Sequence, residues 1–181
     1  MTSPIDPPEG DWWSESVNRR ETIWLGIAGV WSLFLFSWMS GWVRAGDQNP
    51  TGDTYEISPE QFREKVDQYK EAAEETDGGY VPADEHVYIA GQRFQWDGLP
   101  AVLETGTQYQ FHFSSYDVQH ATNIRPEHNL SAQMNFDILP GYEWIVPMTF
   151  DEPGEYHVIC SEFCGDGHRS MHGTFTVVDD E

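Results

Sequence analysis

The longest apolar segment of the chain runs from Thr22 to Val43 and contains no charged residue. At roughly 1.5 Å per residue, a helix of this length spans the roughly 30 Å hydrocarbon core of a bilayer. Trp24 lies near the start of the segment, and Trp38 and Trp42 lie near its end, where tryptophan rings suit the headgroup level. The pattern predicts a transmembrane helix over 22–43.

Basic residues beside this segment predict its orientation. Arg19 and Arg20 precede it and Arg44 follows it, and an excess of basic residues marks the cytoplasmic side. We therefore expect a single-pass protein of the cell membrane, with a cytoplasmic N-terminus and the following domain on the extracellular face. A cleaved signal peptide is the alternative, because Val43 and Ala45 resemble the small residues of a processing site. The length of the apolar run and its tryptophans favour a retained anchor.

Polar segments lie on both sides of the predicted anchor. Residues 1–21 are rich in proline and acidic side chains and predict a disordered tail. Residues 44–86 predict a linker that contains an amphipathic helix at about 58–76. Ser58 can cap this helix and forms a capping box with Gln61. The apolar face of the helix is marked, at helical spacing, by Phe62, Val66, Tyr69 and Ala73.

From Val87 onward the pattern changes to short alternating runs separated by turn residues such as Asp97-Gly98. This pattern predicts one mainly β domain over 87–181, a β-sandwich or open barrel with Greek-key order. The chain of 181 residues has room for one such domain and the anchor. The expected strands are Val87–Trp96, Gln108–Ser114, Tyr142–Phe150, Glu155–Cys160 and Thr174–Val178.

The charge is strongly acidic, with 31 acidic and 9 basic residues and a formal net charge of −22. Nucleic acid is excluded as a partner on electrostatic grounds. An acidic patch that steers a basic cytochrome is one explanation. The acidic residues are spread through every segment and the lysines are confined to Lys65 and Lys70. This dispersed acidity favours a halophilic, archaeal source.

Both cysteines lie in one short segment, Cys160 to Met171, which reads C-x-x-x-C-x-x-x-H-x-x-M with His168 as its histidine. Thiolate, imidazole and thioether together are the ligand set that selects copper over cations that prefer oxygen. A Cys160–Cys164 disulfide is the alternative for a bare pair of cysteines, and it excludes a metal on the same thiolates. Structural zinc sites do not use methionine.

One loop rarely closes a copper site by itself, so a further ligand is expected from elsewhere in the chain. His120 is the candidate, because it follows the alternating run of residues 108–113 and lies far upstream of the cysteine loop. The other histidines lie outside this pattern and are expected to be non-ligands. They are His86, His112, His128, His157 and His172.

The segment from about Val87 to the C-terminus resembles the CuA domain of subunit II of the haem-copper cytochrome c oxidases, with the single-span arrangement of the B-type branch. The resemblance implies a cupredoxin-like Greek-key fold for residues 87–181, with one N-terminal transmembrane helix and a short linking helix. The motifs that carry it are Asp117-Val118-Gln119-His120, Leu139-Pro140-Gly141, Pro153-Gly154-Glu155-Tyr156 and the segment Cys160 to Met171.

The resemblance also implies the ligands of a binuclear copper centre, CuA. Two thiolates would bridge both copper ions, one imidazole would cap each ion, and a thioether and a backbone carbonyl would be weak ligands. In that order the ligands are Cys160 and Cys164, His120 and His168, Met171, and Glu162.

By resemblance, the chain would be subunit II of a terminal oxidase. It would accept electrons from cytochrome c or a blue-copper protein and relay them to haem in subunit I, where oxygen is reduced. Subunit I and membrane lipid are the other expected partners. Magnesium at the subunit I interface, held through Glu162, is a further cofactor that the resemblance raises. Phe94, and second Trp96, match by position the aromatic residues that receive electrons in the family, with a core role as the alternative.

Three other functions fit parts of the sequence. A membrane-anchored blue-copper carrier would bind one copper ion through one cysteine, which leaves the second cysteine unexplained. A copper-free binding or assembly module would carry a Cys160–Cys164 disulfide. A CuA-containing nitric oxide reductase would differ from an oxidase only in its partner subunit.

Overall fold

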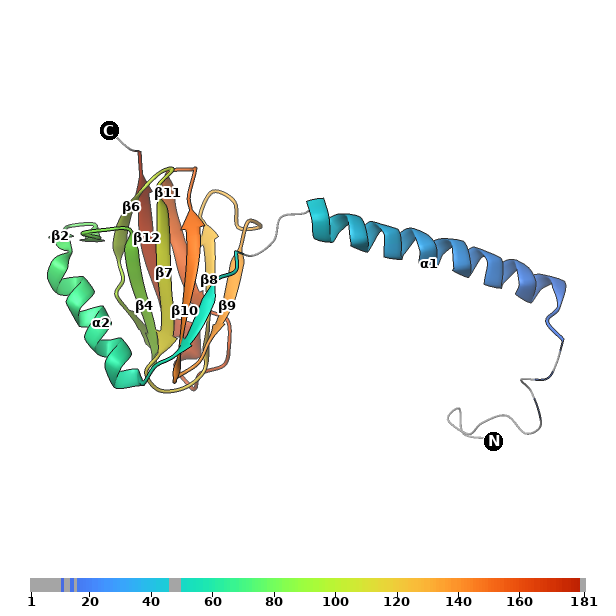
Figure 1. Ribbon diagram of the computed structural model, residues 1–181, viewed down its shortest axis with the longest axis horizontal. Coiled ribbons are helices and arrows are strands. Elements are labelled where there is room, and N and C mark those ends of the chain that lie inside the picture. The colour runs from blue at the N-terminus through green and yellow to red at the C-terminus, as the bar shows by residue number, and fades with distance from the viewer. Residues whose placement is uncertain (1–10, 12–13, 15, 46–49, 180–181) are drawn as a thin grey trace. The chain divides into compact units, whose positions relative to one another are not determined.

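The structure is a computed structural model that describes residues 11, 14, 16–45 and 50–179 (Figure 1). The chain divides into two compact units, residues 1–48 and 49–181. Most of the predicted tail and residues 46–49 of the predicted linker lie outside the described residues.

Helix α1, Arg19–Ala45, makes up most of the described part of the first unit. It is long and apolar enough to cross a membrane, and it includes the predicted span. Asn18 explains where it begins: its side-chain oxygen accepts from the backbone N–H groups of Arg20 and Glu21, and the Glu21 carboxylate accepts from the Asn18 N–H. No described residue of α1 is buried within the chain, so its apolar surface needs lipid or another protein to cover it.

The second unit is a sandwich of two sheets (Figure 1). In its described part the first sheet has the order β1-β10-β7-β4-β5, and the second has the order β2-β3-β6-β12-β11-β8-β9. The strands are β1 Asp53–Glu56, β2 Glu74–Thr76, β3 Gly79–Val81, β4 His86–Gln92, β5 Gln95–Asp97, β6 Ala101–Glu104, β7 Gln108–Ser115, β8 His120–Pro126, β9 Met134–Ile138, β10 Tyr142–Thr149, β11 Gly154–Cys160 and β12 His172–Val178.

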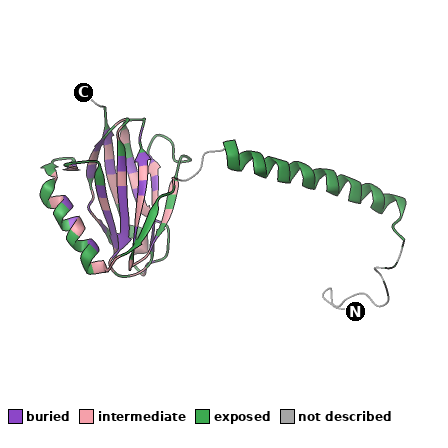
Figure 2. Ribbon diagram, in the orientation of Figure 1, coloured by how far each residue is buried: buried purple, intermediate pink, exposed green. Residues whose placement is uncertain are grey.

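The core lies between the two sheets and is largely aromatic. Phe111 on β7 packs across the sandwich against Phe175 on β12, with ring centroids 6.0 Å apart. Tyr156 on β11 stacks on the same Phe175 ring. Figure 2 shows buried residues along these central strands. This packing fixes β11 and β12, the two strands that flank the cysteine loop.

Helix α2, Pro59–Ala72, packs on the first sheet beside β4 and presents one buried face to it (Figure 2). The predicted capping box is confirmed: the Gln61 N–H donates to Ser58 Oγ, and the Ser58 N–H donates to Gln61 Oε1. Phe62, Val66 and Tyr69 are buried as their spacing predicts. The helix ends at Ala72 rather than near residue 76, because residues 74–76 pair with β3 as strand β2.

The strand predictions are correct for the central strands and incomplete elsewhere. The predicted single strand 87–96 is wrong, because a two-residue turn at Arg93 and Phe94 divides it into β4 and β5, which pair with each other. Strands β8 and β9 lie where no strand was expected. Their residues follow polar and turn-forming segments, and pairing with β11 holds β8 in place.

Candidate metal centre

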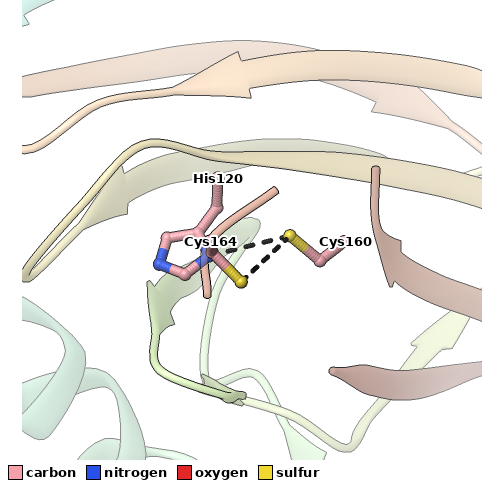
Figure 3. Close-up of side chains that lie close together, drawn as sticks. All are labelled: His120, Cys160 and Cys164. Atoms are coloured by element: carbon pink, nitrogen blue, oxygen red, sulfur yellow. Dashed lines mark hydrogen bonds between the residues drawn. The ribbon is translucent and has the colours of Figure 1, made fainter. Parts of the chain in front are cut away.

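Four segments bring the predicted ligands together at one end of the sandwich. His120 is the first residue of β8, and Cys160 is the last residue of β11. These strands pair with Cys160 opposite Thr122. The loop after β11 carries Cys164 and leads through a short 3-10 helix, His168–Ser170, to Met171 immediately before β12. Figure 3 shows the side chains of His120, Cys160 and Cys164 converging.

The sulfur atoms of the two cysteines lie 3.9 Å apart, and neither cysteine forms a disulfide. Each has a different imidazole beside it: Cys160 Sγ is 3.7 Å from His120 Nδ1, and Cys164 Sγ is 3.8 Å from His168 Nδ1. The arrangement is therefore two thiols side by side with one histidine nitrogen on each.

Two weaker donors complete the cluster. The Met171 Sδ atom lies 3.8 Å from Cys164 Sγ, and the backbone carbonyl of Glu162 lies 3.2 Å from Cys160 Sγ. The Glu162 residue is exposed, whereas Met171 is 1% exposed. All six predicted ligand residues thus lie in one contiguous cluster, with the Glu162 carbonyl, rather than its carboxylate, facing the sulfur.

Asp117 orients His120, a role that the sequence analysis missed. Its Oδ1 atom accepts from His120 Nε2–H at 2.9 Å, which leaves the Nδ1 lone pair directed at Cys160. The same carboxylate accepts from the backbone N–H groups of Arg93 and Val118. A carboxylate that fixes a histidine tautomer is the usual outer-shell partner of a ligating imidazole. Its position three residues before His120, inside the quoted motif, was the available signal.

Arg93 also contacts the cysteine loop, because its Nε–H donates to the Cys164 carbonyl at 3.2 Å. Phe94, next in the chain, packs against the glycines of the loop. A Cβ atom added at Gly167 would lie 2.4 Å from the Phe94 ring, and one at Gly165 would lie 3.1 Å from it. The loop can approach β4 and β5 this closely because both positions lack a side chain.

Trp96 lies on the His120 side of the cluster, with ring centroids 6.2 Å apart, and is 7% exposed. Phe94 is half-buried. Both predicted aromatic residues therefore lie beside the cluster, one against the loop and one against a histidine. Trp96 also belongs to the hydrophobic core, so its ring lies between the core and His120.

The two thiols differ in acidity. Burial raises the pKa of Cys160, but hydrogen bonds from His120 and from backbone groups outweigh burial and lower it to about 6. Burial and the neighbouring charge of Cys160 raise the pKa of Cys164 to about 11. Burial lowers the pKa of His120, and its contacts with Cys160 and Asp117 outweigh this and raise it. The first thiolate forms readily, whereas the second needs a positive charge beside it, such as a metal ion.

The donor set fits a soft metal ion. Two thiols, two imidazoles and a thioether suit copper, whereas magnesium and calcium prefer oxygen ligands. The cysteines, His120 and Met171 are all less than 5% exposed, so a metal ion here would be shielded from water. Two neighbouring thiols, each with its own imidazole, offer enough donors for one copper ion or for a pair of ions that share the thiolates.

Comparisons with known proteins identify relatives of this chain by sequence and by fold. No family model matches the chain. The chain is 34% identical over 91 residues to cytochrome c oxidase subunit 2 of Thermus thermophilus, a match that covers 50% of this chain and 64% of the relative. A second cytochrome c oxidase subunit 2 from the same species is also 34% identical over 91 residues, with 51% of the relative covered. The chain thus spans between half and two thirds of these curated relatives.

Two solved structures share the fold. A chain from the cryo-EM structure of a heme-copper terminal oxidase dimer superposes with a TM-score of 0.57 at 24% identity, covering 88% of this chain and 100% of that one. Reduced rusticyanin, determined by NMR, superposes with a TM-score of 0.50 at 14% identity, covering 72% and 98% of the two chains. The predicted fold class is confirmed: mainly β, cupredoxin-like, with one N-terminal apolar helix.

Proposed function

We propose that this chain is the membrane-anchored electron-transfer subunit, subunit II, of a haem-copper terminal oxidase, and that its cysteine loop holds a binuclear copper centre. One observation carries the proposal: two buried sulfur atoms lie 3.9 Å apart, and each has its own imidazole nitrogen within 3.8 Å. The similarity to cytochrome c oxidase subunit 2 over 91 residues supports it.

The six residues of the cluster have distinct roles in this proposal. Six residues would hold the copper: the thiolates of Cys160 and Cys164, the imidazoles of His120 and His168, and, as weaker donors, the Met171 thioether and the Glu162 backbone carbonyl. When bound, the copper pair accepts and releases one electron at a time. The protein's contribution is to hold these donors in fixed positions and to exclude water. Asp117 keeps the His120 Nε2 proton, so that Nδ1 remains free to coordinate.

A fixed, buried donor set suits electron relay rather than catalysis. His120 begins β8, Cys160 ends β11 and Met171 directly precedes β12, and backbone pairing holds these three strands together. Little atomic movement then accompanies a change in charge, because the ligands cannot relax far. Electrons would come from cytochrome c or a blue-copper protein, through Phe94 or Trp96, and pass to haem in subunit I, where oxygen is reduced.

The anchor and surface complete the proposal. Helix α1 would cross the cell membrane in contact with lipid and subunit I, with the N-terminus cytoplasmic and the copper domain on the extracellular face. Its single span resembles the B-type branch.

The dispersed acidity of the chain supports a haloarchaeal source, where molar salt would screen long-range steering of the donor. The exposed Glu162 carboxylate is available to a magnesium ion at the subunit I interface.

Electron paramagnetic resonance of the full chain, purified in detergent and loaded with copper in high salt, tests the proposal. Two copper ions per chain and a seven-line mixed-valence signal are expected. A four-line signal with one copper ion would instead establish a mononuclear blue-copper carrier, in which one of the two cysteines is a ligand. Absence of copper together with a Cys160–Cys164 disulfide would contradict both.

A further inference from the structure

A second histidine cluster lies away from the cysteine loop, on the first sheet. His86 opens β4 and His112 lies on the neighbouring strand β7. Their rings face each other, with His86 Nδ1 2.7 Å from His112 Nε2. His112 is 3% exposed, whereas His86 is exposed to solvent. The pair thus joins a buried imidazole, that of His112, to one that solvent reaches, that of His86.

A buried carboxylate fixes the His112 ring. Glu143 on β10 is 2% exposed, and its Oε1 atom accepts from His112 Nδ1–H at 2.6 Å. Its other oxygen, Oε2, accepts from Lys65 Nζ at 2.6 Å, and the Tyr88 ring stacks on His112 with centroids 4.1 Å apart. With Nδ1 protonated, His112 Nε2 carries a lone pair directed at His86. This carboxylate-imidazole arrangement is the one that usually supports a metal-ligating histidine.

A cavity lies beside His86, the exposed member of the pair. A cavity of about 190 Å³ is lined by His86, Asp84, Lys65 and Tyr88, among other residues. The Asp84 carboxylate, which also lines this cavity, accepts from the backbone N–H of His86 at 3.0 Å. Lys65, the cation of this cavity, is already paired with Glu143.

We propose that His86 and His112 form a second metal site, which binds one divalent transition-metal ion of the zinc class through His86 Nδ1 and His112 Nε2. Two imidazole ligands favour zinc, copper or nickel over magnesium and calcium. Because His112 Nδ1 carries the proton that bonds to Glu143, the proton between the two rings belongs to His86 Nδ1, and metal binding moves it to His86 Nε2. Nitrogens bound to zinc at about 2.0–2.1 Å in tetrahedral geometry lie about 3.3 Å apart. A small rotation of the exposed His86 ring supplies this separation.

The site is independent of the proposed copper centre, because it shares no residue with it. Its natural comparison is the other histidine pair of the sheets, His157 and His172, whose ring nitrogens lie 3.2 Å apart. That pair is more exposed, and among the residues that the structure describes no buried carboxylate contacts either ring. Glu155, the acidic neighbour of His157, lies 3.5 Å from it and is itself exposed. The preorganised pair is therefore the one that contains His112.

Zinc titration of the full chain in detergent tests the proposal, with Cys160→Ser and Cys164→Ser together as the background that removes competing thiolates. Isothermal calorimetry should show one zinc ion that depends on His86. His86→Ala should abolish this binding, and Glu143→Gln should weaken it about 10–100-fold. The matched control, His172→Ala, should bind as the background does.

Two results would overturn the proposal. One is unchanged zinc binding in His86→Ala, and the other is loss of the ion in His172→Ala with His86 intact. Circular dichroism checks that each variant is folded, and His86→Gln provides a second exposed substitution that retains a polar side chain. A rise in thermal midpoint on zinc addition, present in the background and absent in both His86 variants, is the expected independent readout.

Discussion

At the scale of single residues, the candidate copper site depends on side chains that are not ligands. Asp117 holds the tautomer of His120, and Arg93 holds the carbonyl of Cys164. Asp117 accepts from a buried imidazole, and Arg93 donates to the backbone of a buried cysteine. The ligand residues alone therefore do not define the geometry of the site.

Asp117→Asn tests this orientation. Asparagine keeps the shape of the side chain but loses the charged acceptor for His120 Nε2–H, so copper affinity should fall about 10–100-fold. Competition with a copper chelator measures the change. Asp166→Asn, an exposed residue in the cysteine loop, is the control and should leave affinity unchanged. Equal affinities in the two variants would show that Asp117 has no orienting role.

At the scale of elements, contact between the cysteine loop and the β4–β5 turn positions the donors. Gly167 and Phe94 form the closest part of this contact. Because the loop carries Cys164 and His168, a displacement of the glycine moves both of these donors. Helix α2 has a similar role on the first sheet, where Lys65 reaches the buried Glu143.

Gly167→Ala should displace the loop, since its Cβ atom would lie 2.4 Å from the Phe94 ring. Overpacking of this kind costs about 1–3 kcal/mol, and copper retention during gel filtration should decrease. The double variant Gly167→Ala with Phe94→Ala removes the clash and should regain part of the copper. If the double variant retains no more copper than Gly167→Ala, the clash is not the cause.

Glu143 gives the second element-scale prediction, on stability. Burial raises its pKa, but hydrogen bonds and charge from His112 and Lys65 outweigh burial and hold the pKa below the usual 4.5. A folded-state pKa below the unfolded value stabilises the fold above about pH 4.5, and this stability is lost as pH falls through the folded-state pKa.

Glu143→Gln should therefore lower the free energy of unfolding at pH 7 by about 1–3 kcal/mol. It should also flatten the decline in stability below about pH 4.5. Denaturant unfolding of the metal-free protein, followed by tryptophan fluorescence, measures both effects. Glu75→Gln, on the exposed strand β2, is the control. A decline as steep in Glu143→Gln as in the parent would contradict the assignment.

At the scale of the whole molecule, the two units differ in what they contain. Residues 49–181 contain their own hydrophobic core and every donor of the cluster, whereas α1 has no buried residue within the chain. The anchor and the metal domain can therefore be separated without removing any contact of the core.

A chain that begins at Asn49 should be soluble and should unfold cooperatively, while the full chain should remain with the membrane fraction. Ultracentrifugation and thermal unfolding of the two forms measure this. Because the core is complete in residues 49–181, the thermal midpoint of the domain should be close to that of the full chain in detergent. Aggregation of the truncated chain would mean that α1 also supports the domain.

Under the proposed function, Cys160→Ser in the assembled complex should abolish oxygen uptake with a cytochrome donor, because the proposed copper centre would lose one of its two thiolates. The haem spectrum should be unchanged, since the proposed haems belong to subunit I. Ser161→Ala, an exposed neighbour, is the control for expression and assembly. Normal oxygen uptake by Cys160→Ser would contradict the electron-transfer proposal.

The sequence by itself determined the elements with strong local signals. Uncharged length identified the anchor, the capping residues identified the start of α2, and period-2 runs identified the central strands. The ligand types and their spacing within the cysteine loop predicted a metal, because donor chemistry is a property of the residues themselves. The same local reasoning missed β8 and β9, which are held by pairing across long stretches of chain.

Tertiary structure decided what depends on distance between remote segments. It brought His120 to Cys160, placed Asp117 and Arg93 around the cluster, and divided the predicted strand 87–96 at Arg93 and Phe94. It also joined His86 to His112, two histidines that looked ordinary in sequence. Their significance comes from a third residue, Glu143, buried on another strand. No local pattern in the sequence predicts this contact, because it depends on the pairing of β7 with β4 and with β10.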